Sequence, residues 1–514
     1  MGLATVRLAL LATALVIIVL VKHLTRRRKH GPLPPGPKGF PLVGNVFDLP
    51  DGREQEWKHW AKHRDLYGPI SSVTTMGTTI VILNDLDLAN EMFEKKSSIY
   101  STRAQQTFAG RMVGWENSIA LMLYNKTFVQ SRKRIHTAVG TLRHQTHRFL
   151  LRVLNDPNEL QSHIRTEAGA MILEMIYGYA IEPHKADPLV EIMDTVIEEL
   201  SMAAVPGAWL VDLIPALQHL PSWLPGTGFK KTAEAWHMNL HVAVTRPYEF
   251  ARRRIANGKS KICYVANCGQ NLSDEDDSIV KWTALTLYAG GSDTTGHVLS
   301  AFFLAMTLQP EVQVNAQEEI DRVIGSGRLP TLDDMKALPY INAVVKEAFR
   351  WHFVLPLGIP HAASEDHVVR GYFIPKGAIV MANIGWFSRD LAVYPDPLRF
   401  DPLRYISDSP APEATDWTFG FGRRICPGRY LALNSVWLTI ARALAVFEIG
   451  KGVDELGREM EPVVNPTTGT VSRPGPYQAS IKPRSALHEA LIRQAETLYP
   501  WEPSESHELR DIVV

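Results

Sequence analysis

The residues best suited to chemistry lie in one short loop near the end of the chain. From Phe419 to Gly428 the sequence reads Phe-Gly-Phe-Gly-Arg-Arg-Ile-Cys-Pro-Gly. It places Cys426 between glycine turns and the start of a predicted helix, where backbone N–H groups stabilise a thiolate. Such a thiolate suits either nucleophilic catalysis or axial ligation of a haem iron. A buried structural cysteine is the third interpretation, and the loop alone does not decide among them.

A second candidate lies inside a long apolar stretch, where residues 289–295 read Ala-Gly-Gly-Ser-Asp-Thr-Thr. Adjacent glycines cost a helix interior about 1 kcal/mol each relative to alanine. Gly290 and Gly291 therefore indicate a local widening of the helix or the close approach of a ligand. Asp293 and Thr294 follow at the place where that opening would lie. The alternative is a glycine pair that serves helix packing, beside a solvated acid.

The cysteine loop resembles a known motif. The pattern F-x-x-G-x-R-x-C-x-G is similar to the haem-binding loop of the cytochrome P-450 family. It is matched at Phe419, Gly422, Arg424, Cys426 and Gly428. The resemblance implies that Cys426 ligates the iron of haem b and that Arg424 pairs with a haem propionate. It also implies the fold of that family, which is mainly α-helical with small β-sheets.

The glycine-containing helix resembles the oxygen-activation helix of the same family. On that resemblance, Gly290 and Gly291 would border the O2 pocket. Thr294 and Asp293 would be the catalytic residues: the hydroxyl would hydrogen-bond the oxygen being activated, and the acid would relay protons to it.

Glu347 and Arg350 lie three positions apart, so on a helix they share one face and can form a buried ion pair. The pair resembles the core ion-pair helix of the family. The segment from Pro397 to Phe400, Pro-Leu-Arg-Phe, resembles the "PERF" segment of the family. Arg399 is therefore expected to complete a triad with the pair, and we interpret this triad as structural.

Two further basic residues are expected to bind the haem propionates. His361 ends the sequence Pro-Leu-Gly-Ile-Pro-His, which resembles the strand whose basic residue meets a propionate. Arg132 aligns with the arginine of the family's W-x-x-x-R helix, where this chain has Phe128 in place of the tryptophan. Phenylalanine has no N–H donor, so one propionate contact is expected to be lost.

The composition limits the class of protein. The 514 residues carry 54 Lys+Arg against 54 Asp+Glu, and 45% are hydrophobic, which is enough to build a large core. The balanced charge offers no basic field for nucleic acid. Three cysteines exclude a disulfide-stapled secreted scaffold. No flavin- or nicotinamide-binding motif is visible, so electrons are expected from a separate NADPH-dependent reductase.

The chain is expected to begin with a membrane anchor over residues 1–25. Residues 8–21 are apolar, and with the residues before them they are long enough to span a bilayer. A basic cluster follows, which predicts a single-pass protein of the endoplasmic reticulum membrane with a cytosolic catalytic domain. A cleaved signal peptide is the alternative, but its charges would precede the apolar run. The remaining divisions are expected to be a basic, proline-rich hinge over 26–45, the catalytic domain over 46–484 and a tail over 485–514.

Residue patterns also predict the elements that position these groups. The β-branched residues 70–85, broken at Gly77, predict a hairpin. A helix that starts at Ser273 is expected to reach about residue 307. The apolar, proline-rich residues 203–228 suit a substrate-access or membrane-dipping segment, or ordinary helix breaking. Further elements are predicted near residues 428–447 (helix), 478–482 (strand) and 485–498 (surface helix, with Leu487, Leu491, Ala495 and Leu498 on one face).

These features predict a haem-thiolate monooxygenase that inserts one atom of O2 into a lipophilic small molecule. The sequence as a whole resembles membrane-anchored fungal members of secondary metabolism, which favours a terpenoid over a tryptamine- or polyketide-like aromatic substrate. The reductase, O2 and membrane lipid are the expected partners. Two alternatives stay open. One is a haem-thiolate isomerase, dehydratase or peroxygenase, which needs no proton relay, and the other is a non-catalytic, membrane-anchored binding protein.

Overall fold

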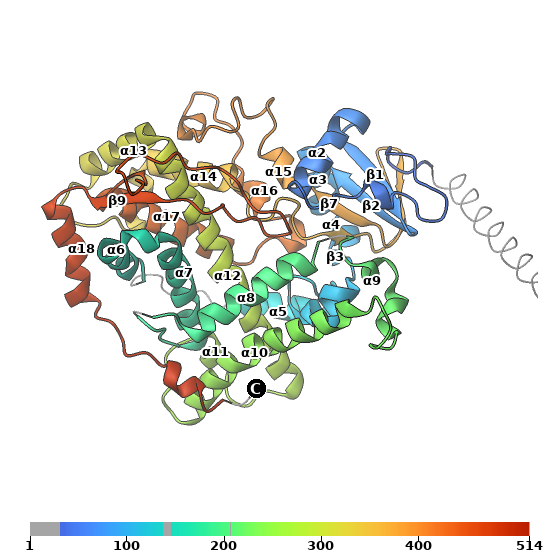
Figure 1. The fold of residues 1–514 in the computed structure, drawn as a ribbon, viewed down its shortest axis with the longest axis horizontal. Coiled ribbons are helices and arrows are strands. Elements are labelled where there is room, and N and C mark those ends of the chain that lie inside the picture. Colours follow the sequence, from blue (N-terminus) through green and yellow to red (C-terminus); the bar gives the residue numbers. More distant parts are fainter. Residues whose placement is uncertain (1–30, 137–144, 184, 206, 513) are drawn as a thin grey trace, which may run out of the picture.

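The computed structural model describes residues 31–136, 145–183, 185–205, 207–512 and 514. Helices dominate, and the larger sheet lies at one end of the molecule (Figure 1). The predicted class, mainly α with small β-sheets, is confirmed. The predicted anchor and the first residues of the hinge lie outside the described part of the chain. Among the helices that are described, none is both long and apolar enough to cross a membrane.

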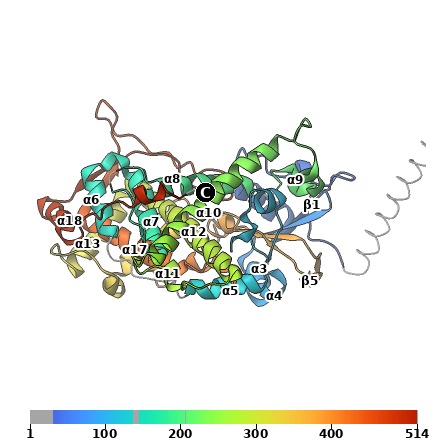
Figure 2. The ribbon, with the colours of Figure 1, turned by 90° about the horizontal axis from the view of Figure 1, so that it is seen from below.

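The helix with the glycine pair runs through the middle of the molecule (Figures 1 and 2). This helix, α12, spans Asp274–Leu308, close to the predicted bounds. The Ser273 hydroxyl caps it by accepting a hydrogen bond from the N–H of Asp276. Four acidic residues in the first turn add favourable charge at the positive end of the helix dipole.

Two hydrophobic cores meet along α12. Up to Ala289 its apolar side chains pack with α7 (Leu160–Tyr177), α8 (Pro188–Ala203) and α10 (Gly228–Ala256). From Val298 onward they pack with α14 (Pro339–Trp351) and α17 (Arg429–Val446). The polar segment 290–297 therefore lies at the junction of the two cores.

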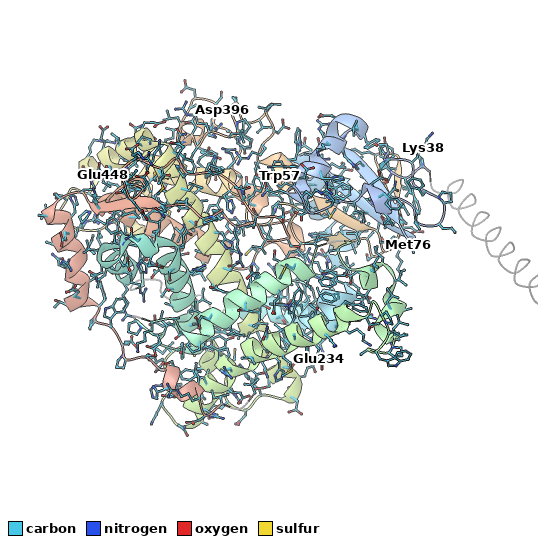
Figure 3. All side chains as sticks on the ribbon, viewed as in Figure 1. Lys38, Trp57, Met76, Glu234, Asp396 and Glu448 are labelled. Carbon is cyan, nitrogen blue, oxygen red and sulfur yellow. The ribbon has the colours of Figure 1, made fainter. Side chains whose placement is uncertain are left out.

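The main sheet has the strand order β1-β2-β7-β4-β3. The predicted hairpin is confirmed as β1 (Ile70–Thr75) and β2 (Thr78–Leu83). Its turn residues Met76 and Gly77 both have positive φ, at 49° and 86°. Met76 and Lys38 lie at the same outer edge of the molecule (Figure 3).

Three short strands complete this sheet. Strand β7 (Ile379–Ala382) runs parallel to β2, and β4 (His361–Ala362) pairs antiparallel with β7. Strand β3 (Thr102–Arg103) pairs with β4, which places Arg103 opposite His361. Two smaller sheets are two-stranded: β5 (His367–Val369) with β6 (Tyr372–Ile374), and β8 (Phe447–Lys451) with β9 (Ala479–Pro483).

Within the proline-rich residues 203–228, α9 (Leu210–Leu213) and the residues Pro215–His219 form short helical turns. On one side Trp209 stacks on Phe108, with ring centroids 3.6 Å apart. On the other side Leu210 and Trp223 are 67% and 80% exposed. The segment is therefore fixed to the domain while apolar side chains point outward, which ordinary helix breaking does not require.

The tail helix α18 (Ala486–Leu498) is confirmed, but its predicted apolar face is only partly correct. Of the residues placed on that face, Ala495 is buried but Leu487 and Leu498 are exposed, and Ile492, which was not placed on it, is buried. The remaining α-helices are α2 (Glu56–Tyr67), α3 (Leu86–Asn90), α4 (Ser97–Tyr100), α5 (Lys126–His136), α6 (Gln145–Asn155), α11 (Tyr264–Asn267), α13 (Pro310–Val323), α15 (Ile384–Phe387) and α16 (Thr415–Thr418).

Candidate active site

The cysteine loop ends directly in front of α17. The N–H of Cys426 donates to the carbonyl of Phe419 at 2.8 Å, and Gly428 is the N-cap of the helix. The thiol is half-buried. Burial raises the pKa of Cys426, whereas the N–H of Gly428 and the charges of Arg132 and Arg429 act to lower it. These donors and cations favour a thiolate once a metal ion adds its own positive charge.

Gly422 allows this loop to lie against the rest of the domain. Its φ is +52°, and a Cβ on it would stand 2.2 Å from the carbonyl oxygen of Phe93. Only glycine fits such an approach. The motif therefore needs glycine at this position for contact with the chain and not only for flexibility.

Arg424, two residues before the cysteine, is buried beside the ring of Phe128, 3.7 Å from the ring centroid. Burial lowers its pKa to about 9, and the charge of Arg132 acts in the same direction. None of the described carboxylates forms an ion pair with Arg424. Its guanidinium instead donates to three backbone carbonyls, at 2.6, 3.1 and 2.7 Å, those of Ser101, Ile119 and Met122.

A second buried arginine, Arg103, lies close enough for the charge of Arg424 to act on it and for its own charge to act on His361. Burial, followed by the charge of Arg424, holds the pKa of Arg103 well below its ordinary value. Its guanidinium also donates to backbone carbonyls, those of Ala120, Ile359 and Pro360. The sequence analysis missed Arg103 because no motif marks it. Only the pairing of β3 with β4 reveals it.

His361 is buried on β4, and its Nδ1–H donates to the carbonyl of Tyr100 at 2.6 Å. Burial, and then the charge of Arg103, lowers its pKa well below the ordinary value. Arg132, on α5, donates to the carbonyl of Ile425 at 2.6 Å and so ties that helix to the cysteine loop.

Phe128 stands where the resemblance expects tryptophan, and it is 1% exposed. Its ring packs under Arg424, so it retains an aromatic surface for the arginine although it has no N–H donor. The loss of one propionate contact stays a prediction.

Four basic side chains, here called the basic cluster, therefore gather around the cysteine loop: Arg103, Arg132, His361 and Arg424. No carboxylate of the described residues forms an ion pair with any of them. Excess positive charge inside a protein is unfavourable unless a partner compensates it. The two carboxylates of a haem would do so, and Cys426 would supply the thiolate. The residues present fit a haem on these grounds.

The two glycines of α12 have different surroundings. A Cβ on Gly290 would have no heavy atom within 4 Å, so this residue borders open space. A Cβ on Gly291 would stand 2.5 Å from Cδ1 of Ile172 on α7. Gly291 therefore serves helix packing, the alternative that the sequence left open. That Gly290 borders an O2 pocket stays a prediction.

The side chains of Asp293 and Thr294 project from different faces of α12. The Thr294 hydroxyl donates to the carbonyl of Gly290 at 2.6 Å. The Asp293 carboxylate is buried and lies 3.2 Å from Nε2 of His297. Nη2 of Arg473 lies 3.7 Å from the same oxygen. The sequence analysis missed both of these basic partners, and the proton-relay roles of Asp293 and Thr294 stay predictions.

The predicted ion pair of Glu347 and Arg350 is present and fully buried, with two N–O distances of 2.7 Å. Its third member is Arg404, whose Nε lies 3.2 Å from Oε1 of Glu347. Arg399 is 54% exposed at its side chain and pairs with Glu311 at 3.3 Å. The prediction that Arg399 completes the triad is therefore wrong.

A repeat in the sequence explains this error. Pro-Leu-Arg-Phe begins at Pro397, and the nearly identical Pro-Leu-Arg-Tyr begins at Pro402. The N–H of Asp401 donates to Oε1 of Glu347 at 2.9 Å. This bond fixes the segment so that the second arginine, Arg404, points at the carboxylate while the first faces solvent.

Three features together define a haem-thiolate oxidoreductase: the cysteine loop at a helix N-terminus, the basic cluster, which has no carboxylate partner among the described residues, and the polar segment 290–297 of the central helix. The family model described as cytochrome P-450 matches residues 34–480, and the chain belongs to that family. Its members hold a haem whose iron is ligated by a cysteine thiolate. The chain is accordingly a cytochrome P-450 monooxygenase.

The chain is similar along nearly its whole length to fungal monooxygenases. It is 46% identical to cytochrome P-450 monooxygenase claR of Ampulloclitocybe clavipes, over 96% of this chain and 94% of the relative. It is 45% identical to cytochrome P-450 monooxygenase 208 of Postia placenta, over 94% and 96%. It is 38% identical to an O-methylsterigmatocystin oxidoreductase of Aspergillus flavus, over 96% and 95%.

Proposed function

We propose that this chain inserts one oxygen atom of O2 into a lipophilic small molecule of fungal secondary metabolism, with the thiolate of Cys426 as the axial ligand of its haem. The observation that carries the proposal is the uncompensated basic cluster beside the cysteine loop. Cys426 in the loop provides the ligand for the iron, and the basic cluster provides the charge that compensates the carboxylates of the cofactor.

In this proposal each residue has a stated task. Arg103, Arg132, His361 and Arg424 bind the propionates. Asp293 and Thr294 move protons toward the oxygen, and Gly290 leaves room for it. When bound, the haem supplies the oxidising chemistry on O2. The Glu347–Arg350–Arg404 triad touches none of these groups and acts as scaffold.

The substrate is proposed to be a terpenoid or another lipophilic metabolite. One relative is named for O-methylsterigmatocystin, which supports an aromatic, polyketide-like compound as the second candidate. Pocket shape decides between such substrates. We expect residues near 101–120 and 200–228 to face the substrate. Phe108 and Trp209, which stack on each other, lie in these two segments, and such apolar aromatic side chains suit an apolar ligand.

The electron donor is proposed to be a membrane-bound NADPH-dependent reductase that docks near Arg423 and Arg429. Arg423 is exposed beside the cysteine loop, and its positive charge suits an acidic partner surface. Location in the endoplasmic reticulum membrane with the catalytic domain in the cytosol is also proposed. It rests on the apolar residues 8–21 and on the Lys and Arg residues that follow them in the sequence. The outward apolar side chains Leu210 and Trp223 support contact with lipid.

Reconstitution with such a reductase tests the proposal. With NADPH, ¹⁸O2 and a panel of terpenoids and polyketide-like aromatics, we expect one ¹⁸O atom in the product and NADPH consumption that depends on the compound. An isomerase or dehydratase would give product without label or NADPH. A peroxygenase would work with hydrogen peroxide and no reductase. A binding protein would bind a compound without converting it.

A further inference from the structure

One contact near the candidate active site has no role in the function proposed above. His297 follows Asp293 by one turn of α12, and its Nε2 lies 3.2 Å from Oδ1 of the acid. The two side chains are only 12% and 4% exposed. They occupy the polar junction between the two cores of α12, where an apolar pair would have continued the core on either side.

Two atoms of this pair lack hydrogen-bond partners among the described residues although both are buried: Oδ2 of Asp293 and Nδ1 of His297. Other buried histidines differ. Nδ1 of His361 donates to the carbonyl of Tyr100, and Nε2 of His352 donates to that of Ser472. Buried polar atoms without partners indicate a site for water or for a transient bond. Within the part of the chain that the structure describes, one ring nitrogen of His297 therefore has no hydrogen-bond partner.

The charge state of Asp293 shows that it needs a proton source. Burial acts to raise its pKa, but the interactions with His297, Arg473 and Arg165 hold that pKa below its ordinary value. An acid in this state is ionised near neutral pH and has no proton of its own to donate. Histidine is the side-chain type that takes up and releases protons most readily near neutrality.

Charged groups connect this pair with the protein surface. Arg473 lies 3.7 Å from Oδ1 of Asp293 and is 27% exposed at its side chain. Asp194 on α8 is 36% exposed and pairs with Arg165 on α7 at 3.8 Å. Burial raises the pKa of Asp194 to about 6, and the charges of Asp293, Arg473 and His297 act on it as well.

We propose that His297 is a positioning and proton-relay residue that supplies Asp293 with protons from the side of Asp194 and Arg473. The proposal rests on the proposed function, because it extends the role given to Asp293. A proton enters at Nδ1 and leaves from Nε2 to Oδ1 of Asp293, which converts the carboxylate to the acid. The ring is left neutral with its hydrogen on Nδ1. Loss of that proton to solvent water, with uptake of a proton from water at Nε2, restores the starting tautomer. The other charged or titratable groups that act on the pair are Arg165, on α7, and His352, after α14.

The test compares His297→Gln with wild type in the full-length, haem-loaded protein. Glutamine can still donate a hydrogen bond to Asp293 but cannot exchange a proton, so the variant separates packing from relay. With reductase, NADPH and O2 but no substrate, we expect NADPH oxidation to slow about a hundredfold, the low end of the range for a positioned proton-transfer group. We also expect a larger solvent isotope effect in D2O. The change His241→Gln, on the exposed side of α10, is the matched control and should alter neither quantity.

A second readout needs no turnover. Infrared difference spectra of the resting holoprotein identify the Asp293 carboxyl band as the one missing in Asp293→Asn. In His297→Gln this band should appear at a higher pH than in wild type, because a neutral amide stabilises the carboxylate less than an imidazolium does.

The variants also separate two kinds of failure. If His297→Gln leaves rate, isotope effect and band unchanged while Asp293→Asn slows NADPH oxidation, the relay is overturned and the proposed function stands. If Asp293→Asn has no effect either, the role of the acid in the proposed function fails with it.

Discussion

Two buried charged clusters, the Glu347–Arg350–Arg404 triad and the basic cluster, differ in whether a carboxylate of the chain compensates their positive charge. In the triad, Glu347 accepts from Arg350 and Arg404, and the other donors of Arg350 reach backbone carbonyls. In the basic cluster, three arginines and a histidine have only backbone carbonyls as acceptors among the described residues. The first cluster is complete within the chain, and the second is complete only with an anionic ligand. Charge balance thus separates scaffold from binding site.

The largest expected effect comes from breaking the triad, the cluster that contains a carboxylate. Glu347→Gln leaves two buried arginines without their counter-charge, so the free energy of unfolding should fall by about 3–5 kcal/mol. Denaturant unfolding of the holoprotein measures the loss of stability. If the variant does not fold at all, it should be expressed in insoluble form. The control is Glu311→Gln, an exposed carboxylate that should cost no more than about 0.5 kcal/mol. Equal losses for both variants would mean that the buried triad is not the scaffold.

The basic cluster should respond in its affinity for the cofactor and not in its fold. Arg424→Gln removes a charged donor from the cluster, worth about 1.5–3 kcal/mol toward an anionic partner. Haem should therefore leave this variant at least about tenfold faster, measured by transfer to apomyoglobin. The neighbouring Arg423→Gln is the control and should keep the wild-type rate. A normal haem off-rate with a strong loss of stability in Arg424→Gln would make the cluster scaffold as well.

The two glycines of α12 show the contrast between scaffold and binding site within one helix, because Gly291 packs against α7 and Gly290 borders open space. Gly291→Ala forces a methyl group against Ile172 and should cost about 1–3 kcal/mol of stability. Gly290→Ala meets no neighbour and should stabilise the helix by up to about 1 kcal/mol. Thermal unfolding of the two variants measures both. The reverse order would show that Gly291, not Gly290, borders open space.

The smallest effect should come from Arg399, the residue that the sequence placed in the triad. Arg399→Gln removes an exposed pair with Glu311 and should change stability by less than about 0.5 kcal/mol. Arg404→Gln should cost about 1–3 kcal/mol, because it leaves a buried carboxylate with one donor fewer. Denaturant midpoints of the two variants decide between the arginines, and a larger loss for Arg399→Gln would restore the original assignment.

The sequence predicts local features well because local chemistry determines them. Ser273 and the acidic turn after it mark the start of α12, and the break at Gly77 marks the hairpin turn. The cysteine loop was recognisable from its own spacing. Features that depend on long-range contact were not predictable. Arg103 joins the basic cluster only through the pairing of β3 with β4.

Dependence on long-range contacts also explains the error over Arg399 and the missed partners of Asp293. Two copies of Pro-Leu-Arg follow each other, and only the bond from Asp401 to Glu347 selects Arg404. The partners of Asp293 come from one turn further along α12 and from Arg473, far away in the sequence. A motif search has no reason to connect them.

The most direct test of the account is the CO difference spectrum of the reduced protein, recorded for wild type, Cys426→Ser and Cys263→Ser. The account predicts stoichiometric haem with the strongly red-shifted Soret band of thiolate ligation in wild type. It predicts that this band is lost in Cys426→Ser and kept in Cys263→Ser, whose cysteine is buried away from the loop. A folded wild-type protein without haem, or a band that survives in Cys426→Ser, would contradict the account.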